Sequence, residues 1–188
     1  MTAIVDAHVH ILPPSFRENR KRLIEIDATF EALFSDPKSC MATSEDLISA
    51  MDKDGVSVAV ALGYGWCDQG VAREANDYLL EAARRFPGRI VPFCGVNPNW
   101  GRAAVLEVER CFSAGARGVG ELHPDTAGFD LGDKATLAPL MELVKEYGHA
   151  INTHSSEPLG HSYPGKGLVK PDILMRFILN FPEVNIIC

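Results

Sequence analysis

The chain has 188 residues, of which 46% are hydrophobic, 23% charged and 8% aromatic. This composition is typical of a folded domain with a buried core and excludes disordered, collagen-like and disulfide-scaffold proteins. The net charge is −7, and no segment gathers lysine and arginine with aromatic residues, so nucleic acid is not an expected partner. The sequence shows neither a membrane-spanning apolar run nor the features of a signal peptide, which predicts a cytoplasmic protein with no membrane partner.

Runs rich in valine and isoleucine alternate with segments of helical periodicity, a pattern typical of βα units on a parallel sheet. The predicted strands cover residues 4–11, 56–62, 89–96, 116–123, 149–155 and 184–188. The predicted helices cover residues 45–53, 71–86, 103–114, 137–147 and 172–180. Residues 13–42 form a polar excursion after the first strand, and no linker divides the chain, so we expect a single domain over residues 1–188.

Two architectures fit this alternation: the doubly wound open sheet and the closed eight-stranded barrel. A dinucleotide-binding open sheet carries Gly-x-Gly-x-x-Gly after its first strand, but here that strand is followed by Leu12-Pro13-Pro14. The pairs Gly63-x-Gly65 and Gly118-x-Gly120 lack the third glycine, and no phosphate-binding P-loop is present. The polar residues at the strand ends must therefore decide between the two architectures.

The first strand carries two histidines on one face. Because side chains alternate along a strand, Asp6, His8 and His10 share one face, and the apolar residues between them share the other. Two buried imidazoles are costly unless their nitrogens find partners, and a divalent metal ion supplies both. The alternative is a hydrogen-bonded histidine pair in a polar core.

The fourth and fifth predicted strands carry similar residues at their carboxyl ends. Glu121 and His123 share one face of the fourth strand, and Asn152 and His154 share one face of the fifth. A lone carboxylate buried among strands requires a cation or a set of hydrogen-bond donors. A metal ion is the simplest explanation for the whole cluster, and we expect His123 and Asn152 to bind substrate beside it.

The loop after the fifth strand is rich in turn-forming residues but also carries His161, Tyr163 and Lys166. Loops at the carboxyl ends of barrel strands commonly carry function, so we expect this one to contact substrate. Lys166 is suited to bind a substrate carboxylate together with Tyr163, and His161 is suited to move a proton. The alternative is a rigid surface turn with a solvated lysine.

Three motifs at these positions resemble the amidohydrolase superfamily of metal-dependent (β/α)8 barrels, in particular its aminocarboxymuconate-semialdehyde decarboxylase-like group. The motifs are Asp6-Ala7-His8-Val9-His10, Gly120-Glu121, and Thr153-His154-Ser155-Ser156-Glu157-Pro158 with the glycine-rich loop behind it. The resemblance covers residues 5–188. It implies that His8 and His10 bind one metal ion, that His154 binds the same ion or a second one, and that Glu121 bridges two ions or supports the site from outside the ligand set. Relatives also use a histidine after strand six and an aspartate after strand eight, for which this sequence has no counterpart.

The resemblance implies two functions that the residues alone do not separate, and the missing aspartate leaves a third open. The first is a hydrolase, in which a metal ion lowers the pKa of bound water to about 7 for attack on a small carbonyl substrate. The second is a metal-dependent carboxy-lyase that decarboxylates an unsaturated or aromatic acid, and the third is a non-catalytic fragment or binding module. The donor set suits zinc first, with manganese, iron or cobalt as alternatives.

The spacing of the predicted strands indicates how many of the eight βα units of a barrel this sequence contains. The strands recur about every 32 residues, so eight βα units would need about 280 residues. The predicted fold is therefore a (β/α)8 barrel that stops after its sixth strand. Open edges at the first and sixth strands would have to be paired, covered or swapped with another copy, so we expect a homo-oligomer.

Overall fold

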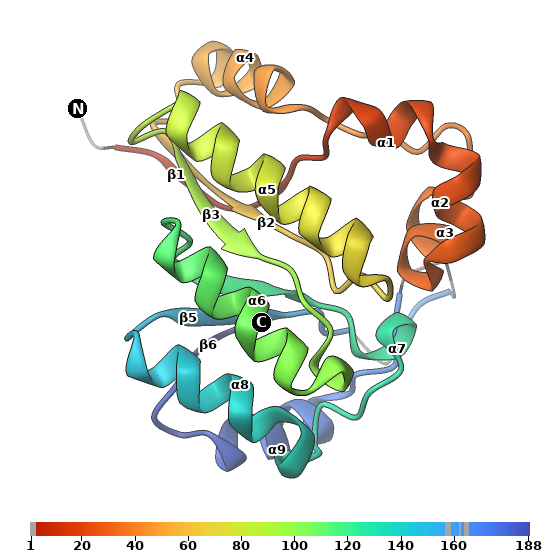
Figure 1. The fold of residues 1–188 in the computed structure, drawn as a ribbon, viewed down its shortest axis with the longest axis vertical. Coiled ribbons are helices and arrows are strands. Elements are labelled where there is room, and N and C mark those ends of the chain that lie inside the picture. The colour runs from red at the N-terminus through yellow and green to blue at the C-terminus, as the bar shows by residue number, and fades with distance from the viewer. Residues whose placement is uncertain (1–2, 157–158, 162, 164–165) are drawn as a thin grey trace.

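The computed structural model describes residues 3–156, 159–161, 163 and 166–188. Six parallel strands form one sheet in the order of the sequence (Figure 1). They are β1 (Val5–His10), β2 (Val58–Leu62), β3 (Ile90–Cys94), β4 (Gly118–Leu122), β5 (Ala150–Thr153) and β6 (Asn185–Ile187). A doubly wound sheet would reverse its strand order partway, so the sequential order excludes that alternative.

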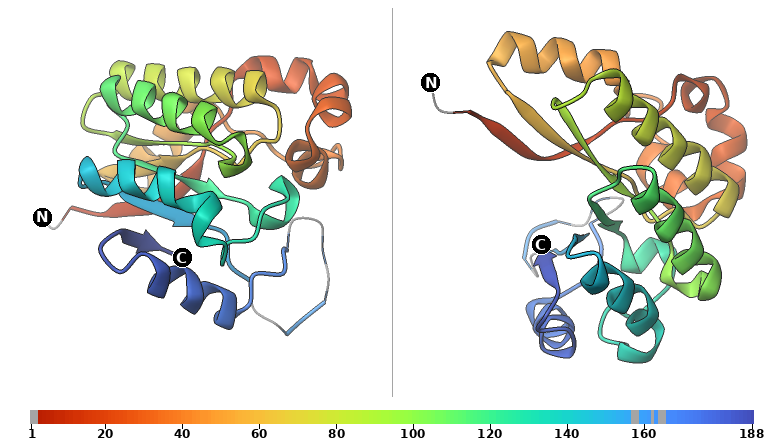
Figure 2. Two further views of the ribbon diagram at one scale, coloured as in Figure 1. Left: turned by 60° about the horizontal axis from the view of Figure 1, so that its bottom comes forward. Right: turned by 60° about the vertical axis from the view of Figure 1, so that its left-hand side comes forward.

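The crossover helices lie on the outer face of the sheet, and the strands curve around the opposite, concave face (Figure 2). The crossover helices are α4 (Ser44–Asp54), α5 (Gln69–Arg85), α6 (Arg102–Ser113), α8 (Lys134–Glu146) and α9 (Pro171–Asn180). This arrangement confirms the predicted α/β fold with six strands of a (β/α)8 barrel. Within the described residues, β1 and β6 form the two edges of the sheet. No described helix combines the length and the apolar character that a membrane crossing requires.

Short helices gather at the carboxyl ends of the strands. They are α1 (Pro14–Glu18), α2 (Arg20–Ile26), α3 (Ala28–Phe34) and α7 (Pro124–Ala127), with a 3-10 turn, η1 (Pro98–Trp100). Phe16 of α1 and Phe30 and Phe34 of α3 pack with Trp66, which follows β2, in an aromatic cluster. Burial of these rings stabilises a cap over one side of the strand ends.

The main core lies between the sheet and its outer helices. Buried Val108, Leu140 and Phe177 from α6, α8 and α9 pack in one hydrophobic cluster with Val119 and Ile151 from the strands. Along β5, Ile151 alternates with Asn152, so the apolar face of this strand points to the helices. Along β4, Val119 and Leu122 both pack in this cluster, and the pairing with β5 is irregular between them, so that Glu121, which lies between these two residues, faces the concave side.

Two features of the chain differ from the sequence prediction. The excursion over residues 13–42 contains the three helices α1 to α3, whose five to seven residues are too few for a clear helical period. Helices α5 and α8 begin two or three residues earlier than predicted, because Asp68 and Asp133 accept hydrogen bonds from backbone N–H groups of the first turn. The single-domain division stays a prediction.

Candidate metal centre

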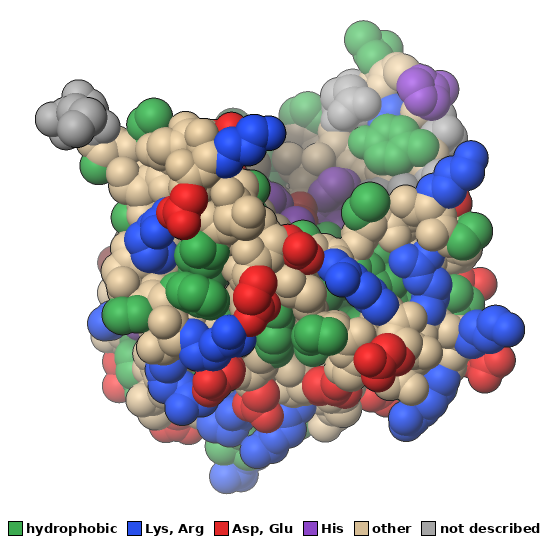
Figure 3. All heavy atoms as spheres, turned by 90° about the horizontal axis from the view of Figure 1, so that it is seen from above, with side chains coloured by type: hydrophobic (Ala, Val, Ile, Leu, Met, Phe, Trp, Pro, Cys, Tyr) green, Lys and Arg blue, Asp and Glu red, His purple; other side chains and the backbone are tan. Residues whose placement is uncertain are grey.

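Polar side chains from three strands meet at the carboxyl ends of the sheet. His8 and His10 come from β1, Glu121 from β4, and His123 and His154 directly follow β4 and β5. The sequence predicts that all five lie together, and the structure brings them together. Figure 3 shows histidine side chains beside an acidic one at the base of a hollow in the molecular surface.

The Glu121 carboxylate is the centre of this cluster. Its Oε2 lies 3.5 Å from Nε2 of His8 and 3.3 Å from Nε2 of His10. The same oxygen lies 3.3 Å from Nε2 of His123, and Oε1 lies 2.9 Å from Nδ1 of His154. Four imidazoles thus face one carboxylate, whose side chain is only 8% exposed.

Two of the rings also contact backbone carbonyls. Nδ1 of His10 lies 3.0 Å from the carbonyl oxygen of Leu62, and Nε2 of His154 lies 2.9 Å from that of Lys166. The ionised Glu121 carboxylate accepts hydrogen bonds only, as the carbonyls do, so a neutral His154 ring has one hydrogen for two acceptors. With a cation at the cluster, hydrogens on Nδ1 of His10 and Nε2 of His154 would bind the carbonyls and leave the other nitrogens of these rings to act as ligands.

Lone pairs that face a carboxylate repel it unless a proton or a cation lies between them. Burial alone would raise the pKa of the Glu121 carboxyl, but the four histidines around it hold its pKa well below its usual range. In return, the hydrogen bond to Glu121 raises the pKa of both His8 and His154. Without a cation, protons on the histidines relieve the repulsion.

This donor set fits a divalent metal ion. Ligand atoms of His8, His10 and Glu121 lie within 4.8 Å of one another, and so do those of Glu121, His123 and His154. Nε2 of His123 is buried and has no hydrogen-bond partner of good geometry among the described residues. Imidazole nitrogen with carboxylate oxygen suits zinc, manganese, iron or cobalt. The cluster can therefore hold an ion in either of two overlapping ligand sets.

Tyr64 is a residue of this centre that the sequence prediction missed. It follows β2, and its ring stacks on that of His10 with the centroids 4.0 Å apart and the planes 11° apart. Burial and the nearby Glu121 carboxylate raise the pKa of its hydroxyl, so the phenol stays protonated. The only signal in the sequence is an aromatic residue flanked by Gly63 and Gly65 at a strand end.

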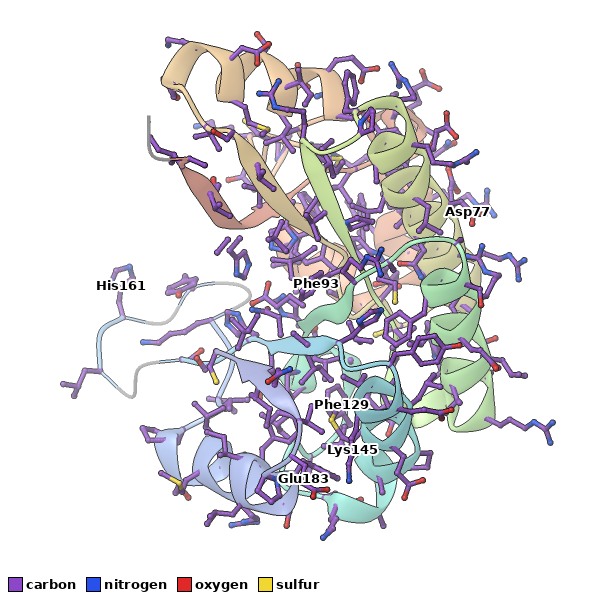
Figure 4. All side chains as sticks on the ribbon, turned by 90° about the vertical axis from the view of Figure 1, so that its left-hand side faces the viewer. Asp77, Phe93, Phe129, Lys145, His161 and Glu183 are labelled. Carbon is purple, nitrogen blue, oxygen red and sulfur yellow. The ribbon has the colours of Figure 1, made fainter. Side chains whose placement is uncertain are left out.

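The remaining predicted residues lie outside the cluster. Asn152 is buried on β5, and its Oδ1 has no partner among the described residues. His161 and Tyr163 are exposed on the loop after β5, where the labelled His161 side chain points away from the sheet (Figure 4). The Lys166 ammonium donates to the carbonyl oxygen of Leu159. The catalytic role of His161 and the substrate-binding roles of His123, Asn152, Tyr163 and Lys166 stay predictions.

Solved structures with the same fold include several decarboxylases, some of them with bound manganese. A 5-carboxyvanillate decarboxylase from Sphingomonas paucimobilis is 14% identical, with a TM-score of 0.72, over 99% of this chain and 67% of that one. Its counterpart from Novosphingobium aromaticivorans, solved with manganese and 4-hydroxy-3-methoxy-5-nitrobenzoic acid, is 18% identical, with a TM-score of 0.73, over 98% and 64%. A protein from Staphylococcus aureus assigned as an amidohydrolase is 15% identical, with a TM-score of 0.68, over 98% and 66%. The chain thus spans about two thirds of the length of these structures.

Sequence comparison identifies the family. No curated protein sequence is significantly similar to this chain. The model of the Amidohydrolase family, in contrast, matches residues 5–188, which is nearly the whole chain and includes every residue of the cluster. The chain therefore belongs to the Amidohydrolase family.

Proposed function

We propose that this chain provides the metal centre of an enzyme that decarboxylates a small aromatic acid. The observation that carries the proposal is the convergence of His8, His10 and His154 on the buried Glu121 carboxylate. Backbone carbonyls at Nδ1 of His10 and Nε2 of His154 can accept the ring hydrogens and leave the other nitrogens of these two rings to bind a divalent cation beside Glu121. A bound cation would supply positive charge to hold and polarise an anionic substrate.

The solved neighbours favour decarboxylation over hydrolysis. Two of the three proteins described above are 5-carboxyvanillate decarboxylases, and one of them was solved with manganese and a nitrobenzoic acid. We therefore place manganese beside zinc as the candidate ion. In the proposed reaction, the bond between the carboxylate carbon and the ring breaks, carbon dioxide leaves, and a proton takes its place on the ring carbon.

Residues around the cluster suit an anionic aromatic substrate. His123 is buried, and its Nε2 has no well-aligned hydrogen-bond partner among the described residues, so a substrate oxygen could provide one. Tyr64 adds an apolar ring beside His10. We propose that these two residues line the substrate site, and that Lys166, Tyr163, His161 and Asn152 are further contacts to be tested.

Hydrolysis of an ester, amide or lactone is the second candidate, because the same centre could bind a water molecule in place of a carboxylate. A non-catalytic binding module is the third, because the activity of relatives belongs to chains about half as long again. We also propose that the edges at β1 and β6 are covered by another copy or by further chain.

One experiment separates these proposals. The chain is loaded with Mn²⁺ or Zn²⁺, its metal content is measured, and it is assayed for carbon dioxide release from hydroxybenzoic acids and for hydrolysis of esters, amides and lactones. Carbon dioxide release that requires the metal and is lost in His10→Ala supports the decarboxylase. Activity confined to esters, amides or lactones supports the hydrolase, and stoichiometric metal without turnover supports the binding module. Failure to bind metal would remove the proposed centre.

A further inference from the structure

Two segments of the chain carry the residues assigned above to the proposed substrate site. Tyr64 lies in the segment that follows β2, residues 63–68, which we call the β2 loop. His123 begins the segment that follows β4, residues 123–127, which contains α7 and which we call the α7 segment. The ring centroids of Tyr64 and His123 lie 5.7 Å apart, and the ring planes are inclined by 47°. The relative position of the two segments therefore determines the spacing of these rings.

The β2 loop lies directly against the end of β4. A Cβ atom at Gly65 would lie 2.9 Å from the backbone nitrogen of His123 and 3.5 Å from its Cβ. The backbone N–H of Glu121 also donates a hydrogen bond to the carbonyl oxygen of Gly63. Because the contact is this close, a small displacement of the β2 loop changes the surroundings of His123.

Thr29 of α3 links the two segments. Its Oγ1 lies 2.9 Å from the carbonyl oxygen of Gly65 in the β2 loop and 2.8 Å from Oγ1 of Thr126 in the α7 segment. Both contacts are satisfied when the Thr29 hydroxyl donates to Gly65 and accepts from Thr126. The residue is fully buried, with 0% of its surface exposed. One buried hydroxyl thus connects the segment of Tyr64 to the segment of His123.

Asp27 attaches the far end of the β2 loop to the same helix. Its Oδ2 accepts hydrogen bonds of 2.7 Å and 2.9 Å from the backbone N–H groups of Cys67 and Asp68, and its Oδ1 accepts one of 2.9 Å from Phe30. None of these bonds reaches the α7 segment. Loss of the Thr29 hydroxyl should therefore leave the β2 loop attached to α3 and break only its link to the α7 segment.

We propose that Thr29 is a positioning residue for the substrate site, where it fixes the distance between the rings of Tyr64 and His123. Without the hydroxyl, the Gly65 carbonyl would lose this partner inside the protein, a change costly enough to move the two segments apart or to admit water. A misplacement of about 1 Å in a binding site can cost about 100-fold in rate. The proposal rests on the proposed function for the identity of the site. The spacing of the two rings, however, is a property of the metal-free chain and can be measured alone.

Three variants test this role, and a fourth is the control. Thr29→Val removes the hydroxyl but keeps the branched shape, whereas Thr29→Ser keeps the hydroxyl. Thr126→Val breaks the same link from its half-buried partner. Thr43→Val is the matched control, because Thr43 is also a buried threonine at the beginning of a helix, but its side-chain hydrogen bonds stay within the first turn of α4.

Two measurements are made on each variant. Nuclear Overhauser spectroscopy of the metal-free protein reports the cross-peak between the rings of Tyr64 and His123. Its reference is the cross-peak between His123 and His154, whose stacked rings have centroids 4.7 Å apart and do not contact Thr29. Calorimetric titration of the Mn²⁺-saturated protein with 4-hydroxybenzoic acid gives the dissociation constant.

The parent, Thr29→Ser and Thr43→Val should show both cross-peaks and similar dissociation constants. Thr29→Val and Thr126→Val should lose most of the cross-peak between Tyr64 and His123, and the dissociation constant for 4-hydroxybenzoic acid should rise about 10-fold. Thermal unfolding verifies that each variant is folded, and Thr126→Val decides the question if Thr29→Val is not.

The outcomes distinguish this inference from the proposed function. An unchanged cross-peak between Tyr64 and His123 in folded Thr29→Val would overturn the positioning role. An equal loss in Thr29→Ser or Thr43→Val would do the same, because the hydroxyl of Thr29 would then not be the cause. Unchanged affinity for 4-hydroxybenzoic acid despite a lost cross-peak would show that the spacing does not serve substrate binding. A lost cross-peak in a chain that binds neither Mn²⁺ nor 4-hydroxybenzoic acid would uphold the link through Thr29 and contradict the proposed function.

Discussion

Nε2 of His10 lies 3.3 Å from Oε2 of Glu121, although two other strands separate β1 from β4 in the sheet. In a flat sheet, strands three places apart are about 14 Å apart. The curvature of the sheet therefore creates the cluster, because it turns the concave faces of β1 and β4 toward each other. The position of the candidate metal is a consequence of the barrel-like fold.

The first prediction concerns the metal ligands. His10→Ala removes Nε2, the proposed ligand atom, from a ring whose Nδ1 contacts the carbonyl oxygen of Leu62. The dissociation constant for Mn²⁺ or Zn²⁺ should therefore rise at least about 100-fold. Calorimetric titration measures it. His149→Ala is the matched control, because His149 packs against Phe112 at the opposite end of β5 and should leave the dissociation constant unchanged. Equal affinity in the two variants would contradict the ligand assignment.

The second prediction concerns Tyr64. Replacing its ring with leucine removes the stack on His10 and a further contact with Trp66, whose ring centroid is 5.0 Å away. Such pairs contribute about 0.5–1.5 kcal/mol each, so Tyr64→Leu should lower the free energy of unfolding by about 1–3 kcal/mol. It should also weaken metal binding several-fold, because His10 is then less well fixed.

Tyr64→Phe is the control for this change. It keeps the ring and removes only the hydroxyl, so it should bind metal with nearly the affinity of the parent. Urea unfolding and calorimetric titration provide the two measurements. If leucine and phenylalanine variants bind metal equally well, the stack on His10 does not support the centre.

Much of the centre is predictable from the sequence because it depends on short-range periodicity. The two-residue period of a strand places His8 with His10 and Glu121 with His123, and the carboxyl ends of parallel strands meet at one edge. Neither rule needs knowledge of the tertiary structure. Five cluster residues were therefore accessible from the pattern of polar residues at strand ends.

The rest depends on contacts that no local pattern encodes. Tyr64 belongs to the centre only because the chain after β2 passes over His10. The loop after β5 contacts His154 through the backbone carbonyl of Lys166 and Asp125 through the backbone N–H of Leu168, whereas the sequence prediction concerned the side chains of that loop. His161 follows His154 closely in the sequence, but irregular loops have no period that would predict the direction of a side chain.

The third prediction concerns a charged network on the outer face. Glu107 on α6 accepts hydrogen bonds from Arg110 and from Asn76. Asn76 in turn binds both backbone groups of Gly95, after β3. Burial would raise the pKa of the Glu107 carboxyl, but the hydrogen bonds from Arg110 and Asn76 prevail and hold it below its ordinary value of 4.5.

The direction of the pH dependence follows from this lowered pKa. An ionised Glu107 stabilises the fold above the unfolded-state pKa, and this contribution is lost as the pH falls through the folded-state value. Glu107→Gln should therefore lower the free energy of unfolding by about 1–2 kcal/mol at neutral pH and by progressively less in acid. Urea unfolding of the parent and of Glu107→Gln, from neutral pH into the acidic range, measures this difference in the free energy of unfolding.

The control for this prediction is Glu109→Gln. Glu109 is exposed on the same helix, so its replacement should change stability by less than about 0.5 kcal/mol. A pH-independent difference between the parent and Glu107→Gln would show that packing rather than charge accounts for the role of Glu107.

The fourth prediction concerns Gly120, which precedes Glu121 on β4. Its φ is +140°, and a Cβ atom there would lie 2.6 Å from the carbonyl oxygen of Asn152 and 2.8 Å from its Cβ. Both neighbours belong to the adjacent strand and cannot move without disturbing the β4–β5 pair. Gly120→Ala should therefore lower the free energy of unfolding by about 2–4 kcal/mol and displace Glu121, so that metal binding is lost as well.

Gly55→Ala separates the backbone penalty of a positive φ from the crowding between β4 and β5. Gly55 ends α4 with a φ of +73°, and a Cβ there would meet no atom within 4 Å, so only the backbone penalty of about 1 kcal/mol applies. Thermal and urea unfolding of both variants give the comparison. Equal losses would mean that the crowding between β4 and β5 contributes nothing. A larger loss at Gly120, accompanied by loss of metal, would show that close contact between these two strands is what holds the Glu121 carboxylate among the histidines.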